Sequence, residues 1–304
     1  MKAVFVDAGD VLAAVTEHLI RPDDPQVVIN RHPGILPTAL PAVIGDAEIL
    51  IIDHTAFPID IARQCAALKH VVFLGTGARS YMDPEALAEA GITVHLIKGY
   101  GDTAVAEHAV ALMWAAARGL VIMDREVRAG NWLRSEGMQL TGKTLGLIGF
   151  GGIAAEVARL AGGMGMRVIA WNRTPKTHAG VEFTSLERLL AESHVVSLHL
   201  LLTDETRGFL SAGRLAAMRP GAILVNTARG ALVEEAAMIA ALASGALGHA
   251  ALDVFPVEPL PAGDPLTALP NVTLSAHSAF RTPEASDNLI QAALDHCRRI
   301  TANT

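Results

Sequence analysis

The chain contains few cysteines, and this excludes a disulfide framework. Cys65 and Cys297 are the only two among 304 residues, and their separation fits neither a metal-ligand nor a redox spacing. Two isolated thiols are typical of a protein kept in a reducing compartment. We therefore expect free thiols, no bound metal and a cytoplasmic protein.

Basic charge is scarce relative to acidic charge. The chain has 24 Lys and Arg residues against 31 Asp and Glu residues, which gives a net charge of −7. Proteins that bind nucleic acids use a surplus of basic residues to displace counterions from phosphates. We therefore expect no nucleic-acid partner.

Long apolar runs are missing as well. The most apolar run, residues 109–123, contains Arg118 and is shorter than the roughly 20 residues that cross a membrane. The first residues carry charge too early for a signal peptide. We expect no membrane partner. With 51% hydrophobic residues, the chain has the composition of a globular protein with substantial cores.

Short aliphatic runs alternate with helical patterns over nearly the whole sequence. This alternation is typical of parallel sheets covered by helices on both faces. It occurs in two series, so we predict an α/β fold with two doubly wound, Rossmann-like domains and a cleft between them. The first series has expected strands at 3–6, 48–52, 71–74 and 93–96 and helices at 60–68 and 84–90. The second has strands near Leu145, Val168, Val195, Ile223, Ala250 and Val272.

Two segments place the boundary between these domains. The glycine-rich residues 98–102 separate the two series. The last helical pattern, 283–299, follows the final strand and has no further strand to reach, so we interpret it as returning to the first domain. The predicted first domain comprises residues 1–98 with 280–304, and the second comprises residues 99–279.

The second series opens with a glycine pattern that suits a dinucleotide. An apolar strand near residue 145 runs into a turn in which Gly149 permits the tight bend and Gly151 lets phosphates approach the backbone. The small Ala154 then allows close packing of helix on strand. Phosphates are favoured at such a helix N-terminus by its unpaired N–H groups. We predict a dinucleotide pyrophosphate at this turn.

The residues after the next strand, 167–171, indicate which dinucleotide binds. An acidic residue there would accept from both ribose hydroxyls and repel a 2′-phosphate. The chain has Asn172, Arg173 and Thr174 instead, and Arg173 offers a guanidinium where a 2′-phosphate would lie. The sequence therefore favours NADP(H) over NAD(H).

Three later strands are each followed by a polar residue with catalytic potential. These residues are Arg229, Glu258 and His277, and ligands of open α/β sheets bind outside the carboxyl ends of strands. Arg229 can hold a carboxylate through two hydrogen bonds. His277 can donate a proton to a neighbouring carbonyl, and Glu258 can hold its other ring nitrogen. Together they predict reduction of a 2-keto acid.

The chain resembles the D-isomer-specific 2-hydroxyacid dehydrogenases, which include glyoxylate and hydroxypyruvate reductases, glycerate dehydrogenases and phosphoglycerate dehydrogenase. The resemblance covers about residues 68–285. It rests on motifs that occur in the order of that family, namely Lys69 with Gly75–Gly77, Val105–His108, Gly142–Gly146, the Gly149 turn, Asn226–Gly230, Asp253–Pro259 and His277.

The resemblance implies a role for each of these residues. It makes the first domain substrate-binding, the second dinucleotide-binding, and Arg229, Glu258 and His277 catalytic. With Arg229, the backbone of Gly75, Thr76 and Gly77 would bind the substrate carboxylate. Besides Gly149 and Asn172, the cofactor contacts would be Thr103, Phe150, Gly151, Gly152, Ile153, Arg173, Thr174, Thr206, Thr227, Ala228 and Asp253.

The expected activity is NAD(P)H-dependent reduction of a small 2-keto acid to the D-2-hydroxy acid by a homodimer. One departure leaves the substrate open, because residues 78–81 replace the usual Val-Asp with one extra residue, and this segment borders the substrate in the family. Two alternatives also stay open. One is a dinucleotide-sensing binding protein on the same fold, and the other is oxidation of phosphite.

Overall fold

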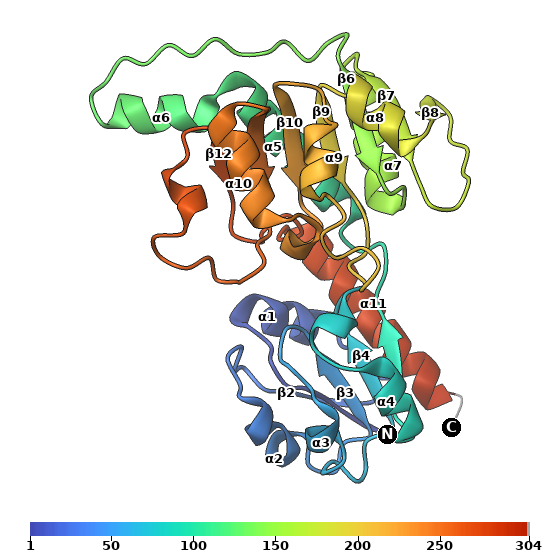
Figure 1. Cartoon of the computed structure of the whole chain (residues 1–304). Coiled ribbons are helices and arrows are strands. Elements are labelled where there is room, and N and C mark those ends of the chain that lie inside the picture. The colour runs from blue at the N-terminus through green and yellow to red at the C-terminus, as the bar shows by residue number, and fades with distance from the viewer. Residues whose placement is uncertain (303–304) are drawn as a thin grey trace. The chain divides into compact units, whose positions relative to one another are not determined.

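The computed structural model describes residues 1–302, and the chain divides into two compact units. Unit 1 comprises residues 1–101 with the C-terminal residues from 281 onward, and unit 2 comprises residues 102–280 (Figure 1). Each unit is built on one parallel sheet with helices on both faces. The predicted fold class of two doubly wound α/β domains is confirmed.

The sheet of unit 1 has five parallel strands in the order β2-β1-β3-β4-β5. The strands are β1 (Lys2–Phe5), β2 (Gln26–Ile29), β3 (Ile49–Ile52), β4 (His70–Phe73) and β5 (Thr93–Leu96). The helices are α1 (Asp10–Leu19), α2 (Leu40–Ile44), α3 (Ile59–Ala62), α4 (Pro84–Glu89) and α11 (Pro283–Ala302), with 3-10 turns at Pro37–Ala39 and Ala78–Ser80.

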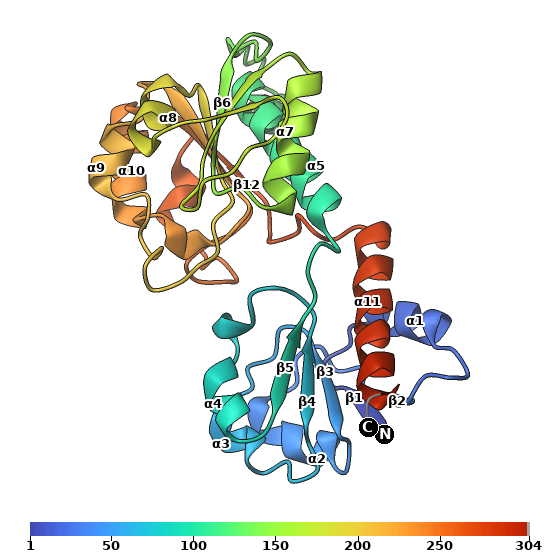
Figure 2. The ribbon, with the colours of Figure 1, turned by 90° about the vertical axis from the view of Figure 1, so that its right-hand side faces the viewer.

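Helix α11 belongs to the core of unit 1 although it lies at the other end of the sequence. Leu289, Ile290 and Leu294 are buried against one face of the sheet, where α1 also packs (Figure 2). Their spacing puts them on one side of the helix. The opposite face is covered by α2, α3 and α4. The central strand β3 is therefore buried on both sides and reads as four consecutive aliphatic residues.

The sheet of unit 2 has seven parallel strands in the order β12-β11-β10-β9-β6-β7-β8. They are β6 (Thr144–Ile148), β7 (Arg167–Trp171), β8 (Val181–Phe183), β9 (Val195–Leu198), β10 (Ala222–Asn226), β11 (Leu247–Leu252) and β12 (Val272–Leu274). The helices are α5 (Asp102–Arg118), α6 (Leu120–Arg128), α7 (Gly152–Gly163), α8 (Leu186–Glu192), α9 (Ala212–Ala216) and α10 (Glu235–Ser244), with 3-10 turns at Gly230–Leu232 and Pro265–Ala268.

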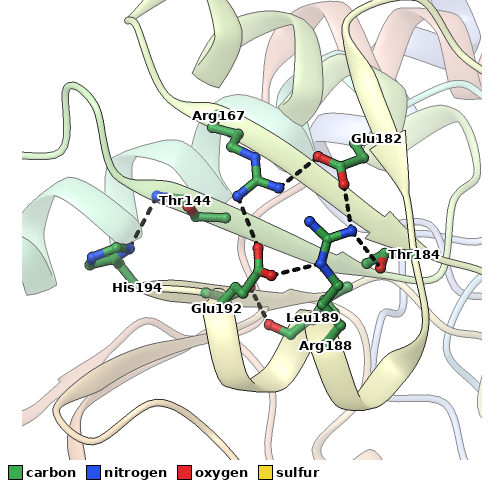
Figure 3. Close-up of polar contacts among 9 residues, drawn as sticks. Thr144, Arg167, Glu182, Thr184, Arg188, Leu189, Glu192 and His194 are labelled. Atoms are coloured by element: carbon green, nitrogen blue, oxygen red, sulfur yellow. Dashed lines mark hydrogen bonds and ion pairs between the residues drawn. The ribbon is translucent and has the colours of Figure 1, made fainter.

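The two faces of this sheet carry separate cores. Helices α5 and α7 pack on one face through small residues such as Ala109 and Ala154. Helices α8, α9 and α10 cover the other through larger ones such as Leu189 and Leu242. At the edge, Arg167 and Arg188 alternate with Glu182 and Glu192 in a ring of ion pairs that joins β7, β8 and α8 (Figure 3).

Sequence patterns missed the least buried elements and overestimated one helix. Strands β2 and β8 lie at sheet edges, are half-exposed and were not predicted. Strand β8 has a central glutamate, whereas β2 has three aliphatic residues after Gln26 that the sequence patterns overlooked. The helix expected at 60–68 ends at Ala62. Both Lys69 and His70 donate to the carbonyl of Glu48, so the chain must turn early to enter β4.

Within residues 1–302, no single helix is long and apolar enough to cross a membrane. Helices α5 and α6 satisfy that criterion only when taken as a pair, and they are bent by 66° at the break between them.

Candidate active site

The carboxyl ends of three neighbouring strands in unit 2 lie in register. Asn226 of β10 is paired with Leu252 of β11, which is paired with Leu274 of β12. The chain therefore leaves these three strands at the same edge of the sheet. The predicted catalytic residues Arg229, Glu258 and His277 all lie in the loops that follow.

His277 and Glu258 form a direct pair across two of these loops. The imidazole Nδ1 lies 2.6 Å from Oε2 of Glu258, and the other carboxylate oxygen accepts the backbone N–H of Phe255 at 2.8 Å. Both side chains are partly exposed, 26% for His277 and 35% for Glu258. Because Glu258 is itself held by the backbone of its loop, it fixes the orientation of the imidazole.

The loop that carries His277 is held by the buried carboxylate of Asp253. One oxygen accepts from the Ser275 hydroxyl at 2.6 Å and from the backbone N–H of Ser278 at 2.9 Å, and the other accepts from the N–H of Ala279 at 2.9 Å. The Asp253 carbonyl also accepts the N–H of His277. Among residues 1–302, His277 is the only non-glycine residue with positive φ, at 47°. These bonds hold it in that uncommon conformation.

His108 of α5 completes this arrangement. Its Nε2 lies 2.9 Å from the Ser275 hydroxyl and 3.4 Å from Oδ1 of Asp253. Burial raises the pKa of Asp253, but the hydrogen bonds from His108, Ser275 and the two backbone N–H groups outweigh it and lower the pKa from 3.8 to about 2. Asp253 is thus a stable buried anion at neutral pH.

Arg229 projects from a loop with little conformational freedom. Its Nη1 donates to the Ala228 carbonyl at 2.7 Å, and the Asn226 side chain bonds the loop at Ala228 and at Arg229. A Cβ at Gly230 would come within 2.1 Å of the Phe255 carbonyl carbon. The Arg229 loop therefore rests directly on the loop that leads to Glu258, and only glycine fits between them.

The predicted phosphate turn lies at the end of β6, two strands away from β10. Gly149 has φ of +87°, and a Cβ there would come within 2.7 Å of the His199 carbonyl oxygen. Helix α7 begins directly after it, and neither a capping side chain nor an acidic residue occupies its first turn. Gly151 and Gly152 are exposed, Ile153 is half-buried and Phe150 is buried. The turn therefore offers backbone N–H groups to an anion.

The segment after β7 is attached to this turn. The Asn172 side chain accepts from the Phe150 N–H at 3.0 Å and donates to the Thr174 carbonyl, and Lys176 donates to the Phe150 carbonyl. Asn172 therefore shapes the segment. Arg173 is 80% exposed and forms an ion pair with Glu205 at 2.8 Å.

The other predicted cofactor residues of unit 2 differ in burial and in hydrogen bonding. Thr103 is exposed in the first turn of α5, and Thr227 is buried directly after β10. Thr206 bonds within its own loop, to Leu201 and Thr203. The predicted substrate segment Gly75–Gly77 follows β4 and belongs to unit 1.

Sequence reasoning assigned no role to His108 or Ser275. His108 was part of a recognised motif, but only the fold places it against Ser275, 167 residues later in the chain.

Comparisons with known proteins show the family of this chain. A sequence model of the D-isomer specific 2-hydroxyacid dehydrogenase NAD binding domain matches residues 110–279, which is more than half of the chain. The match lies within unit 2, so the cofactor is a nicotinamide dinucleotide.

Relatives with assigned activities match over most of their length. The glyoxylate reductase of Aeropyrum pernix is 40% identical over 77% of this chain and 76% of its own. The glycerate dehydrogenase of Methylorubrum extorquens is 33% identical over 99% and 96%. The crystal structure of the TT0316 protein from Thermus thermophilus superposes with a TM-score of 0.88 at 35% identity, covering 100% of this chain and 97% of that one. The chain therefore belongs to the D-isomer-specific 2-hydroxyacid dehydrogenases, and it is an oxidoreductase, as its motifs predicted.

Proposed function

We propose that this protein reduces a small 2-keto acid to the D-2-hydroxy acid. The observation that carries the proposal is the Glu258–His277 pair, which lies beside the Arg229 loop at in-register strand ends of the unit that binds the dinucleotide. A proton donor and a carboxylate anchor at one edge of the sheet are what reduction of a 2-keto acid requires.

When bound, the reduced nicotinamide supplies the hydride, and residues of this chain do the rest. Arg229 binds the substrate carboxylate and thereby orients the adjacent carbonyl. His277 donates a proton from Nε2 to the carbonyl oxygen, because its Nδ1 is held by Glu258. We assign the backbone of Gly75–Gly77 to the substrate carboxylate, unit 1 to substrate binding and unit 2 to the cofactor.

The residues around α7 fit a dinucleotide. The exposed Gly151 leaves room for a pyrophosphate at the N-terminus of α7. The first turn of α7 itself has no acidic side chain, but the carboxylate of Asp102, the first residue of α5, lies against Gly152. We assign the remaining contacts to Gly149, Phe150, Ile153, Asn172, Thr174, Thr103, Thr206, Thr227 and Ala228. Asp253 is better assigned to positioning the His277 loop, since its carboxylate is buried and accepts four hydrogen bonds or ion pairs there.

NADP(H) remains the preferred cofactor in this proposal. Arg173 follows β7 without an acidic neighbour in sequence, but Glu205 pairs with it across the surface. Exposed ion pairs of this kind contribute little to stability, and a 2′-phosphate offers more charge and more acceptors than one carboxylate. Arg173 can therefore exchange Glu205 for the phosphate.

A homodimer is supported by an apolar surface on unit 2. A long segment without regular structure, residues 129–140, follows helix α6 (Figure 1). Together they expose Leu120, Val121, Val127, Trp132 and Leu133, and Trp132 is 82% exposed. A pocket of about 400 Å³ borders the same segment. Apolar clusters of this kind mark protein interfaces, and we propose a second copy of this chain as the partner.

A cytoplasmic location stays a prediction. Cys65 and Cys297 are both buried and form no disulfide, which suits a reducing compartment.

The first prediction concerns the proton donor. Wild type should reduce glyoxylate or hydroxypyruvate with NADPH, and His277→Gln should lose at least ~100-fold in kcat, because it removes only the acid. Cofactor binding, followed by NADPH fluorescence, should be retained. Glu258→Gln should also lower kcat, because the imidazole loses the carboxylate that orients it. No turnover of any 2-keto acid by wild type would favour a dinucleotide sensor or phosphite oxidation instead.

The second prediction concerns Asp253. Asp253→Asn should lower the free energy of unfolding at pH 6 by about 1–3 kcal/mol, because buried N–H groups lose a charged acceptor. A carboxylate whose pKa is lowered on folding stabilises the protein above its unfolded pKa and loses that effect as pH falls through its folded pKa, here from about 4 to about 2.

Denaturant unfolding should therefore show the largest difference between Asp253→Asn and wild type at pH 6, and a smaller one at pH 3. Ser275→Ala, which removes one donor only, should have a milder effect. A difference that does not change between the two pH values would mean that the charge of Asp253 is unimportant.

The third prediction concerns the cofactor. Arg173→Ala should weaken NADPH by roughly 10-fold or more, the scale of a charge-assisted hydrogen bond, and should leave NADH nearly unchanged. Glu205→Gln should tighten NADPH, since it removes the competitor of the phosphate. Dissociation constants for both cofactors test this, and equal losses for NADPH and NADH in Arg173→Ala would contradict the preference.

The fourth prediction concerns assembly. Trp132→Glu should convert dimers to monomers in sedimentation velocity, because it places a charge in the apolar surface. Leu36→Glu is the control, since Leu36 is 69% exposed in unit 1, outside this surface. A monomeric wild type, or a dimer unaffected by Trp132→Glu, would exclude this interface.

A further inference from the structure

A second buried carboxylate, Asp7, holds a turn at the carboxyl edge of the unit 1 sheet. Asp7 follows β1 and is 4% exposed. Its oxygens accept three successive backbone N–H groups after β3, those of Asp53, His54 and Thr55, at 2.9–3.1 Å. Burial raises the pKa of Asp7, and the hydrogen bonds from Asp53 and Thr55 oppose that rise.

The turn that Asp7 anchors presents a histidine. Nδ1 of His54 lies 2.7 Å from Oδ2 of Asp53, and the imidazole is 48% exposed while Asp53 is 18% exposed. The Asp53 carboxylate orients the ring. Asp7 and Asp53 thus correspond to Asp253 and Glu258 in unit 2. In each unit one buried carboxylate holds a loop, and a second carboxylate orients the histidine on that loop.

This histidine lies next to the segment assigned to the substrate carboxylate. Strand β3 is paired with β4, whose end leads into Gly75–Gly77. The His54 ring meets the ring of Tyr81 edge-on at 5.5 Å, and Tyr81 closes the turn that begins at Gly77. The Tyr81 carbonyl accepts the N–H of Phe57, so the segments after β3 and β4 are bonded to each other.

We propose that His54 is a specificity-determining residue that selects 2-keto acids with a hydroxyl on the carbon next to the carbonyl. The inference rests on the proposed reductase function. A substrate whose carboxylate lies on Gly75–Gly77 extends its third carbon over the neighbouring surface, where His54 offers a hydrogen-bonding ring. Sites built to bind a substrate hydroxyl discriminate strongly against analogues that lack it.

The surrounding charge favours a hydroxyl over a second carboxylate. Asp53 contacts the ring and Asp7 lies beneath the same turn, so a dianionic substrate would approach two acidic groups. The other nearby cation, Arg79, forms an ion pair with Glu85 of α4. A neutral hydroxyl can bond the imidazole without that repulsion.

The test is the ratio of kcat/KM for hydroxypyruvate to kcat/KM for pyruvate, two substrates that differ by this hydroxyl. Wild type should prefer hydroxypyruvate, and His54→Leu should lower the ratio by roughly 10-fold or more. His54→Gln, which keeps a hydrogen-bonding group, should retain most of the preference. His32→Leu, at an exposed histidine elsewhere in unit 1, is the matched control and should leave the ratio unchanged.

The outcomes separate this inference from the proposed function. If wild type reduces both substrates and His54→Leu keeps the wild-type ratio, or if wild type prefers pyruvate, His54 does not select a hydroxyl and the reductase function stands. If wild type reduces neither, both proposals fail. Should His54→Leu not fold, Asp53→Asn keeps the ring but releases its orientation, and an unchanged ratio in that variant overturns the inference.

Discussion

A carboxylate buried at the end of a strand holds a histidine-bearing loop in each unit. Asp253 follows β11 and binds the N–H groups of Ser278 and Ala279, while Asp7 follows β1 and binds those of residues 53–55. A buried charge is tolerated only where several hydrogen-bond donors satisfy it. Displacing either loop would leave the carboxylate buried without these donors, so both loops are held in place. Both loops carry a histidine whose orientation is set by a further carboxylate.

This constraint explains how a histidine outside regular secondary structure keeps one orientation. A side chain that transfers a proton must stay in place to within a fraction of an ångström, and a loop alone does not provide that. In unit 2 the loop is fixed at Ser275 by the hydroxyl, at His277 by the backbone and at Ala279 by the N–H group. The positive φ of His277 is maintained by these bonds.

The catalytic candidates could be predicted because each follows a strand and carries distinctive chemistry. Arg229, Glu258 and His277 were found from their motifs, and so was the turn at Gly149. His108 and Ser275 were not assigned, because their role depends on α5 lying against the end of β12, a contact between segments far apart in sequence. The ion pair of Arg173 with Glu205 was missed for the same reason, since 32 residues separate the partners.

The sequence by itself determined the elements that local pattern controls. Aliphatic runs specified the buried strands, and glycines specified the phosphate turn, because burial on both faces and a left-handed backbone each permit few residue types. The tertiary structure decided where the edge strands β2 and β8 form, why α3 ends early, and which backbone N–H groups the buried carboxylates bind. Those depend on strand order and register, and a carboxylate that binds distant backbone N–H groups leaves no periodic trace in the sequence around it.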